Sequence, residues 1–291
     1  MLKLKTKGVK YSRKYYSDGS IKYNKIKKLK KLNENVNKTI ITDNQENNMK
    51  FLLISDLHFG NEFENLGLID RAYNYCIKNG INIILCGGDF IDGSFSKSPQ
   101  KITDLYDQIE YFIKNYPQDK NILTFGVAGD HDFSTLKRAS LDIIEICNNR
   151  RHDIIIGGYN NAEINIKNDK IHLFHNILGG RMHSAQAPII LCGHLHKYMT
   201  QQKNNSLYIT LPTLSNINQQ MPSALELDVS FSKGYISSAV IKHLYFGTQD
   251  FVLSESEFNL LNGRNTNNEI KNVESYRQNL DAEKILKKTN N

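Results

Sequence analysis

Carboxylate and imidazole side chains recur directly after short apolar segments of this sequence. The recurrences are Asp56-Leu57-His58, Gly88-Asp89-Phe90-Ile91-Asp92, Gly129-Asp130-His131-Asp132, His175 and Gly193-His194-Leu195-His196. Both kinds of side chain bind divalent metals, and both transfer protons in catalysis. Because no Ser or Cys nucleophile motif accompanies them, the pattern predicts metal-assisted chemistry.

A cluster of these side chains would need cations. Like charges repel and buried carboxylates are costly, so the cluster would be unstable without metal. Oxygen and nitrogen ligands without thiolate suit Mn, Fe, Zn or Co better than Ca. The ligand number is too high for one tetrahedral ion and suggests two metals roughly 3.5–4 Å apart, bridged by a carboxylate. Since residues i and i+2 of a strand point the same way, Asp56 with His58, and His194 with His196, should each serve one centre.

Alternating strands and helices are predicted to position these residues. From Lys50 onward the order is β-α-β-α-β-α, which implies parallel strands with helices on the sheet faces. The predicted strands are Phe51–Ser55, Ile81–Cys86 and Ile122–Ala128, and the predicted helices are Leu66–Lys78, Ile102–Asn115 and Leu136–Cys147.

Only strands are predicted after Asp153, and they indicate a second, mixed sheet. They are Ile154–Ile156, Glu163–Ile166, Ile171–Phe174, Ile189–Cys192, Leu207–Thr210, Ala224–Val229 and Tyr235–Ile241. In open α/β sheets the carboxyl ends of the strands face one crevice, where ligands bind. The five Asp and His segments are therefore expected to meet at that crevice.

The ordered series D-x-H, G-D-x-x-D, G-N-H-D, H, G-H-x-H is the signature of the calcineurin-like metallophosphoesterases, and this sequence resembles it. Here the series reads Asp56-x-His58, Gly88-Asp89-x-x-Asp92, Gly129-Asp130-His131-Asp132, His175 and Gly193-His194-x-His196. Each motif alone is weak, but five in order, each after an apolar strand, are highly specific. The resemblance implies an α/β fold, a four-layer αββα sandwich of two mixed β-sheets flanked by helices.

The resemblance also implies a ligand set for two divalent ions, with Mn the first expectation and Fe, Zn or Co the others. One metal would be held by Asp56, His58 and His196, and the other by Asp130, His175 and His194. Asp89 would bridge the two metals. A hydroxide activated by both metals would then attack phosphorus.

Three further residues receive roles from the same resemblance. His131 would lie beside the scissile phosphate and stabilise the transition state or protonate the leaving oxygen. Asp132 would orient the His131 ring and fix its tautomer. Asp92 would lie near the bridging carboxylate of Asp89 and support it without binding a metal itself. The family has Asn where Asp130 stands, so this chain adds a negative charge next to the expected phosphate.

These residues predict a metal-dependent phosphoric ester hydrolase acting on a phosphodiester or a phosphomonoester. Two segments, Ser55 to Gly60 and Gly88 to Asp92, look more like the branch of DNA-repair exonucleases and small phosphodiesterases. The Ser/Thr protein phosphatase branch fits less well, because Gly93 and Ser94, not Arg, follow Asp92. The sequence favours neither a nuclease acting on DNA or RNA nor a general phosphodiesterase over the other. The alternative from another class is a non-catalytic scaffold of the same fold that binds a protein or nucleic acid.

Arg181 is a weaker candidate for substrate binding. It lies in Gly179-Gly180-Arg181, close in sequence to His175, and a guanidinium there could hold a phosphate. A solvated loop charge is the competing interpretation. His152, His172, His183 and His243 are not expected to be ligands.

Basic charge is concentrated in residues 1–50, which hold 14 Lys and Arg against 4 Asp and Glu; the other 241 residues hold 23 against 26. A Tyr-rich hairpin around Ser17-Asp18-Gly19-Ser20 and the basic run Lys25 to Lys31 are predicted there. This extension could contact nucleic acid, contact a membrane surface or act as a solubilising segment.

The composition divides the chain into three parts: a basic extension over 1–48 that ends in a polar linker, a phosphoesterase domain over 49–250, and a polar helical tail over 251–291. No apolar run is long enough to cross a bilayer, so no transmembrane segment is expected. Cys76, Cys86, Cys147 and Cys192 lie in apolar runs without a CxxC pair, which indicates reduced thiols in a cytoplasmic protein.

Overall fold

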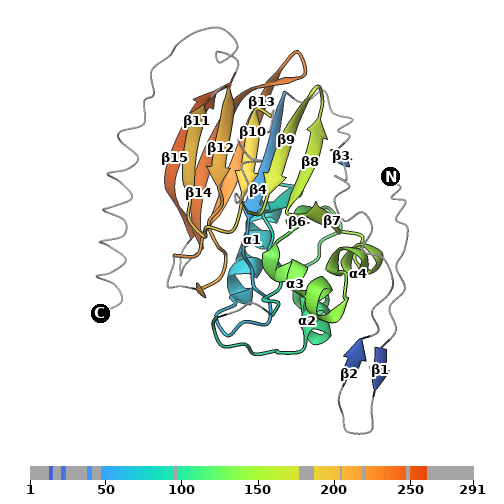
Figure 1. Ribbon diagram of the computed structural model, residues 1–291. Helices are drawn as coiled ribbons and strands as arrows, with labels where there is room; N and C mark the ends of the chain where they lie inside the picture. The colour runs from blue at the N-terminus through green and yellow to red at the C-terminus, as the bar shows by residue number, and fades with distance from the viewer. Residues whose placement is uncertain are drawn as a thin grey trace, which may run out of the picture.

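Two mixed β-sheets form the centre of the protein (Figure 1). The computed structural model describes residues 13–15, 21–23, 38–40, 47–94, 97–176, 187–203, 205–217, 221–246 and 250–260. The seven-stranded sheet has the order β15-β14-β13-β4-β5-β6-β7. Its strands are β4 (Asn48–Ile54), β5 (Ile83–Cys86), β6 (Leu123–Ala128), β7 (Ile154–Tyr159), β13 (Ala224–Ser232), β14 (Tyr235–Phe246) and β15 (Asp250–Asn259).

The six-stranded sheet has the order β11-β12-β10-β9-β8-β3. Its strands are β3 (Lys38–Ile40), β8 (Asn161–Ile166), β9 (Asp169–Phe174), β10 (Ile189–Cys192), β11 (Met199–Lys203) and β12 (Ser206–Thr210). β9, β10 and β12 run parallel to one another, whereas β8 pairs antiparallel with β9, and β11 pairs antiparallel with β12. The prediction of a second, mixed sheet is therefore confirmed, but β7, β13 and β14, which were expected in it, belong to the seven-stranded sheet.

Alternation along β4 shows how the layers are built. Phe51 and Leu53 point into the core between the two sheets, while Leu52 and Ile54 point into the core beneath the helices. All four side chains are at most 1% exposed, as expected for a central strand covered on both faces. The helices are α1 (Leu66–Asn79), α2 (Leu105–Asn115), α3 (Asp130–Ala139) and α4 (Ile143–Arg150).

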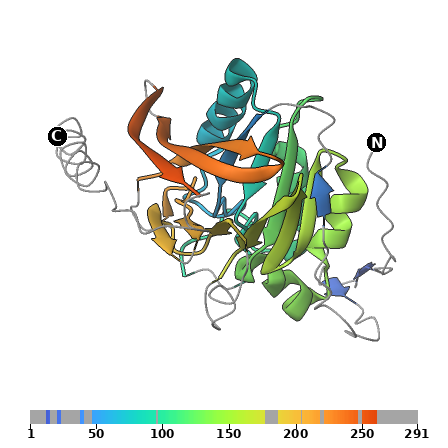
Figure 2. The same cartoon turned by 90° about the horizontal axis from the view of Figure 1, so that it is seen from above.

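All four described helices contribute to one apolar core with the outer face of the seven-stranded sheet (Figure 2). The outer face of the six-stranded sheet carries a separate small apolar cluster of Phe174, Ala187, Ile190 and Cys192. The predicted α/β fold of two mixed sheets with helices is therefore confirmed, although none of the described helices covers the outer face of the six-stranded sheet.

Residues 136–147, predicted as one helix, are divided between two helices. α3 ends at Ser140, whose φ of 57° is left-handed. Asp142 then caps α4 by accepting hydrogen bonds from the amides of Ile144 and Glu145 at 3.1 and 3.3 Å. A left-handed residue followed by an N-cap ends one helix and begins another, which the apolar spacing alone did not reveal.

Both predicted ends of the domain over 49–250 need correction. The expected linker contains β3, which pairs in parallel with Ile164–Ile166 of β8. The expected tail begins with β15, which pairs antiparallel with β14. Leu253 and Phe258 are its only buried apolar side chains in a mostly polar sequence, so the apolar pattern of a strand was weak. Residues 261–291 lie outside the described part, and so does the turn between β1 (Arg13–Tyr15) and β2 (Ile21–Tyr23), which pair antiparallel.

Candidate metal centre

The ends of β4, β5, β6, β9 and β10 bring the predicted side chains together. Two groups contain all seven expected ligands, and within each group the candidate ligand atoms all lie within 4.8 Å of one another. The first contains Asp56, His58 and His196, and the second contains Asp89, Asp130, His175 and His194. The expectation from strand order is thus met: segments up to 140 residues apart in sequence converge at one edge of the sheets.

The first group is almost closed to solvent. Asp56 is fully buried, and its Oδ1 lies 3.3 Å from His196 Nε2. Burial by itself would raise the pKa of Asp56, but the His196 contact and the nearby His175 and His58 rings lower the pKa to about 2. Asp56 is therefore ionised and available as an oxygen ligand.

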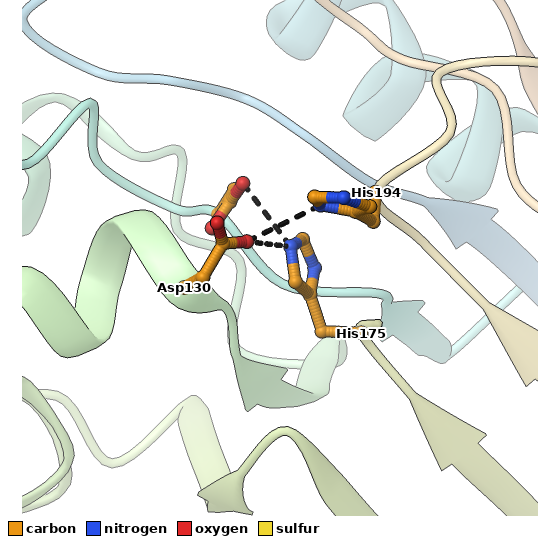
Figure 3. A group of neighbouring side chains, drawn as sticks. Asp130, His175 and His194 are labelled. Atoms are coloured by element: carbon orange, nitrogen blue, oxygen red, sulfur yellow. Dashed lines mark hydrogen bonds and ion pairs between the residues drawn. The ribbon is translucent and has the colours of Figure 1, made fainter. Parts of the chain in front are cut away.

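The second group is more open, and Figure 3 shows the Asp130 carboxylate directed at two imidazole rings. Asp130 Oδ1 lies 2.8 Å from His175 Nε2 and 3.2 Å from His194 Nδ1. His175 Nδ1 lies 2.7 Å from the Gly87 carbonyl oxygen, which can only accept a hydrogen bond. Nδ1 therefore carries the proton, and Nε2 is the nitrogen that can bind a metal.

Asp89 lies between the two groups. Its Oδ2 is 3.2 Å from His175 Nε2 and 3.9 Å from His58 Nε2, and its Oδ1 accepts a hydrogen bond from the His131 amide at 3.0 Å. A carboxylate in this place can contribute an oxygen to each group, which is the geometry a bridging ligand needs.

Five of the seven residues in the two groups have left-handed backbone. The φ angles are 54° at Asp56, 50° at His58, 52° at Asp89, 68° at His194 and 57° at His196. Non-glycine residues seldom adopt this conformation, and such strain concentrates at functional sites. The premise of extended backbone behind the i, i+2 prediction is therefore wrong. Asp56 and His58 still share a group, but His194 and His196 belong to different ones.

Glycines make room for this crowded edge. A Cβ on Gly129 would lie 2.1 Å from Asp89 Oδ1 and 2.7 Å from the Asp89 amide nitrogen. Gly88 combines a φ of 105° with a Cβ position only 2.6 Å from His175 Nδ1. No side chain fits at either position while Asp89 and His175 keep their places.

The donor set fits divalent cations. Both ring nitrogens of His58 are buried and lack a hydrogen-bond partner among the described residues, which is costly for a polar group unless a metal binds it. Carboxylate charge from Asp89 and the Asp130 hydrogen bond outweigh burial and raise the pKa of His175 well above its usual range. A cation would replace the bound protons, because metal ligands must be deprotonated.

Asp92 and His131 form part of a third group with His58. The Asp92 carboxylate already accepts hydrogen bonds from Asn61 Nδ2 at 3.0 Å and Gln100 Nε2 at 2.5 Å. It lies 3.4 Å from His58 Nδ1. This carboxylate therefore lies behind a ligand of the first group, and its hydrogen bonds are satisfied without a cation.

The structure contradicts the predicted orienting role of Asp132. The fully buried Asp132 carboxylate accepts hydrogen bonds from the backbone amides of Phe90, Ile91 and Gly129 at 3.1, 3.0 and 2.8 Å. His131 Nδ1 instead lies 2.5 Å from the carbonyl oxygen of Asp92. Adjacent residues at the start of α3 point in different directions, so Asp132 holds the backbone around Asp89 rather than the neighbouring ring.

Sequence reasoning missed several polar residues around the centre. Asn176 Nδ2 lies 3.5 Å from His194 Nε2, and Thr213 Oγ1 donates a hydrogen bond to the Asp56 carbonyl oxygen at 2.8 Å. Asn61 lies three residues after His58, and Asn176 follows His175, so closeness to a motif was the available signal for both. Arg181 lies outside the described residues.

Comparison with known proteins gives the family. The model of the calcineurin-like phosphoesterase superfamily domain matches residues 49–230. No curated protein sequence matches the chain. Within the described residues, no helix is long and apolar enough to cross a membrane.

Solved structures similar to this chain include an archaeal phosphodiesterase, with 16% identity, a TM-score of 0.45, and coverage of 70% of this chain and 100% of that one. They also include Yfce, a phosphoesterase from E. coli, with 15% identity, a TM-score of 0.47, and coverage of 72% and 98%. Vacuolar protein sorting 29 from Cryptosporidium parvum has 16% identity, a TM-score of 0.46, and coverage of 74% and 100%. The family match spans more than half of the chain and contains all the residues of both ligand groups, so the protein belongs to the calcineurin-like phosphoesterase superfamily.

Proposed function

We propose that this protein is a metal-dependent phosphoesterase that hydrolyses a phosphodiester or a phosphomonoester at a two-metal centre. The observation that carries the proposal is the pair of ligand groups that meet at Asp89, with the His131 ring centroid 4.7 Å from that of His58. A scaffold that only bound partners would have no need for left-handed backbone at five candidate ligands.

Two divalent ions, when bound, would activate water and neutralise phosphate charge. Asp56, His58 and His196 would hold one ion, Asp130, His175 and His194 the other, and Asp89 both. His131 is 20% exposed at its side chain, which leaves it accessible to a substrate from the open side of the site.

The contact between His131 and Asp92 defines which nitrogen can work as the acid. Because the Asp92 carbonyl can only accept a hydrogen bond, Nδ1 carries the proton. Nε2 is then the nitrogen that protonates the leaving oxygen. Burial lowers the pKa of His131, but the charges of Asp89, Asp130 and Asp92 outweigh it and raise the pKa, which favours the protonated acid.

The substrate class follows from the resemblance of Ser55–Gly60 and Gly88–Asp92 to small phosphodiesterases and repair exonucleases. We propose a phosphodiester as the first choice, with DNA or RNA among the candidates. Activity on single-stranded DNA, RNA, cyclic nucleotides and phosphomonoesters ranks these possibilities directly.

The test is hydrolysis of bis-p-nitrophenyl phosphate by the full chain with Mn, with and without EDTA. We expect turnover that EDTA abolishes and Mn restores. Asp89→Asn should lose both metal and turnover, whereas Asp70→Asn, at an exposed position of α1, should keep both. A folded chain that hydrolyses no phosphoester with any of Mn, Fe, Zn or Co would support the scaffold alternative.

A further inference from the structure

We infer that Gln108 is a positioning residue that holds His131 through the Asp92–Gly93 peptide. The inference rests on the proposed function, in which His131 Nε2 protonates the leaving oxygen. Gln108 belongs to α2 and is fully buried, although glutamine is usually exposed. A buried amide in a helix requires partners, and those partners lie around Gly93.

One peptide unit connects the two side chains. The carbonyl oxygen of Asp92 lies 2.5 Å from His131 Nδ1, and the amide of Gly93 donates to Gln108 Oε1 at 2.7 Å. These two groups belong to the same planar trans peptide, in which C=O and N–H point in opposite directions. Fixing the direction of the N–H therefore fixes the direction of the C=O that holds the imidazole.

The next carbonyl is held from two sides. Gln100 Nε2 donates to the Gly93 carbonyl at 2.8 Å, and Gln108 Nε2 approaches the same oxygen at 3.3 Å while donating to the Ile102 carbonyl at 2.7 Å. The Gln108 side chain thus forms hydrogen bonds with both the amide and the carbonyl of Gly93. Gln100 assists and also binds the Asp92 carboxylate at 2.5 Å.

Close packing carries this restraint to the ring. Gly93 has a φ of 61°, and a Cβ there would lie 2.2 Å from the His131 carbonyl oxygen and 2.4 Å from Ser134 Oγ. The Ser94 amide donates to the same Ser134 Oγ at 2.7 Å. The segment after Asp92 therefore packs closely against the first turns of α3. Gln108 determines how the Asp92–Gly93 peptide is oriented relative to His131.

The test replaces Gln108 with Met, which keeps the length of the side chain and removes its hydrogen bonds. The full chain is assayed with Mn on two diaryl phosphates, one releasing p-nitrophenol and the other phenol. Phenolate leaves more readily with a proton, whereas p-nitrophenolate departs without one. We expect Gln108→Met to lower kcat about tenfold or more for the phenyl ester and far less for the p-nitrophenyl ester, with KM and bound metal unchanged.

Three controls separate positioning from a loss of folding. Ile113→Ala weakens the same helix without touching Gly93, so it should lower stability and leave the ratio of the two rates alone. Gln100→Met keeps the hydrogen bond from the Gly93 amide to Gln108. It should therefore change the ratio of the two rates less than Gln108→Met does. In a His131→Ala background, Gln108→Met should cost no further rate, because both changes act through one ring.

A readout without catalysis completes the test. In the full chain labelled with 15N-histidine, the Nδ1 resonance of His131, identified by its loss in His131→Ala, should shift in Gln108→Met and persist in Ile113→Ala. Equal losses on both esters, or additive losses in the double variant, would overturn the positioning role while leaving the phosphoesterase proposal intact. Absence of metal-dependent hydrolysis in the unaltered chain would overturn both.

Discussion

His131 is the residue on which the chemistry of the site depends most directly. Its Nδ1 is bound to a backbone carbonyl, so its tautomer does not depend on the ionisation of a carboxylate partner. The carboxylates around it raise its pKa although burial opposes this. These contacts favour the proton donor that the proposed mechanism requires, next to two groups of candidate metal ligands.

Replacing His131 by Ala should remove the acid without removing the metals. We expect kcat on a phenyl ester to fall about 100-fold to 10,000-fold, the usual contribution of a general acid. Metal content, measured by mass spectrometry after dialysis, should match that of the unaltered chain. Retained activity would disprove the assigned role, and lost metal would make His131 a ligand.

Asp130 occupies the position at which the family signature has Asn. The negative charge of Asp130 is therefore expected to affect the binding of an anionic substrate. Its carboxylate contacts His175 and His194, and these contacts lower its pKa although burial opposes them, so it is ionised. Asp130→Asn should lower KM for an anionic phosphoester several-fold, because a negative charge beside the phosphate is removed. Bound metal should fall only modestly. Unchanged KM, rate and metal content together would show that the departure is neutral.

At the scale of elements, glycines at the strand ends allow the ligands to approach one another. Gly88 and Gly129 lie where the chain leaves β5 and β6, and added side chains there would collide with His175 and Asp89 of the site. Gly80 ends α1 in a left-handed conformation, with a φ of 66° and open space around it. The two kinds of glycine can therefore be separated by experiment.

Gly129→Ala should displace Asp89 and abolish metal binding, because the new Cβ would lie 2.1 Å from Asp89 Oδ1. Gly80→Ala meets nothing within 4 Å but is held at a left-handed φ. It should cost about 1–2 kcal/mol of folding free energy and leave metal content unchanged. Urea unfolding and metal analysis of both variants check the pair. Full metal content in Gly129→Ala would show that the strand end relaxes.

Folding stability is a property of the whole molecule, and one buried histidine makes it depend on pH. His243 on β14 packs against Tyr198, with its Nε2 at 2.8 Å from Ser223 Oγ. Burial lowers the pKa of His243 to about 4 in the folded protein. The unfolded chain binds the proton first, so stability is fully present above the unfolded pKa of about 6.5 and falls as the pH drops toward 4.

We expect acidification from about pH 7.5 to about pH 5 to cost roughly 2 kcal/mol through His243 alone. In His243→Gln the new side chain can still donate to Ser223 but cannot titrate. Between the two pH values, the free energy of unfolding of this variant should therefore fall about 2 kcal/mol less than that of the unaltered chain. Urea unfolding at both pH values measures the difference. His152→Gln, at an exposed position, serves as the control. Equal pH dependence in His243→Gln and the unaltered chain would contradict the assignment.

The basic extension and β3 can be separated by two truncations. Residues 1–35 hold 12 Lys and Arg against 2 Asp and Glu, so their deletion removes the net charge of +10 but keeps β3. Deletion of residues 1–48 also removes β3 and opens the edge of β8. Both truncations should weaken binding to single-stranded DNA equally, with the loss shrinking at high salt.

Only the longer truncation should lower the melting temperature, by a few degrees, since only it removes a strand of the two central sheets. Hydrolysis of a small phosphoester should survive both, because the described site contains no residue before Asp56. Unchanged DNA binding in both truncations would show that the basic extension is not a polyanion contact.

The sequence by itself predicted most of the strands and the residues that gather at their ends. Apolar strands of a few residues, each followed by Asp, His or Gly, predicted β4 to β6, β9 and β10 and placed their ends together. This works because periodicity and strand ends are local properties, and parallel strands present their ends to one edge. Weakly patterned edge strands such as β11 and β15 escaped prediction for the same reason.

Only the tertiary structure decided the backbone conformation of the ligand segments and what holds them. His194 and His196, which the resemblance assigns to different metals, fall into different groups, and both have left-handed backbone, which spacing does not report. Asp132 bonds to the amides of Phe90 and Ile91, and Gln108 reaches Gly93 from another element. Such contacts depend on how elements distant in sequence pack, so no local pattern specifies them.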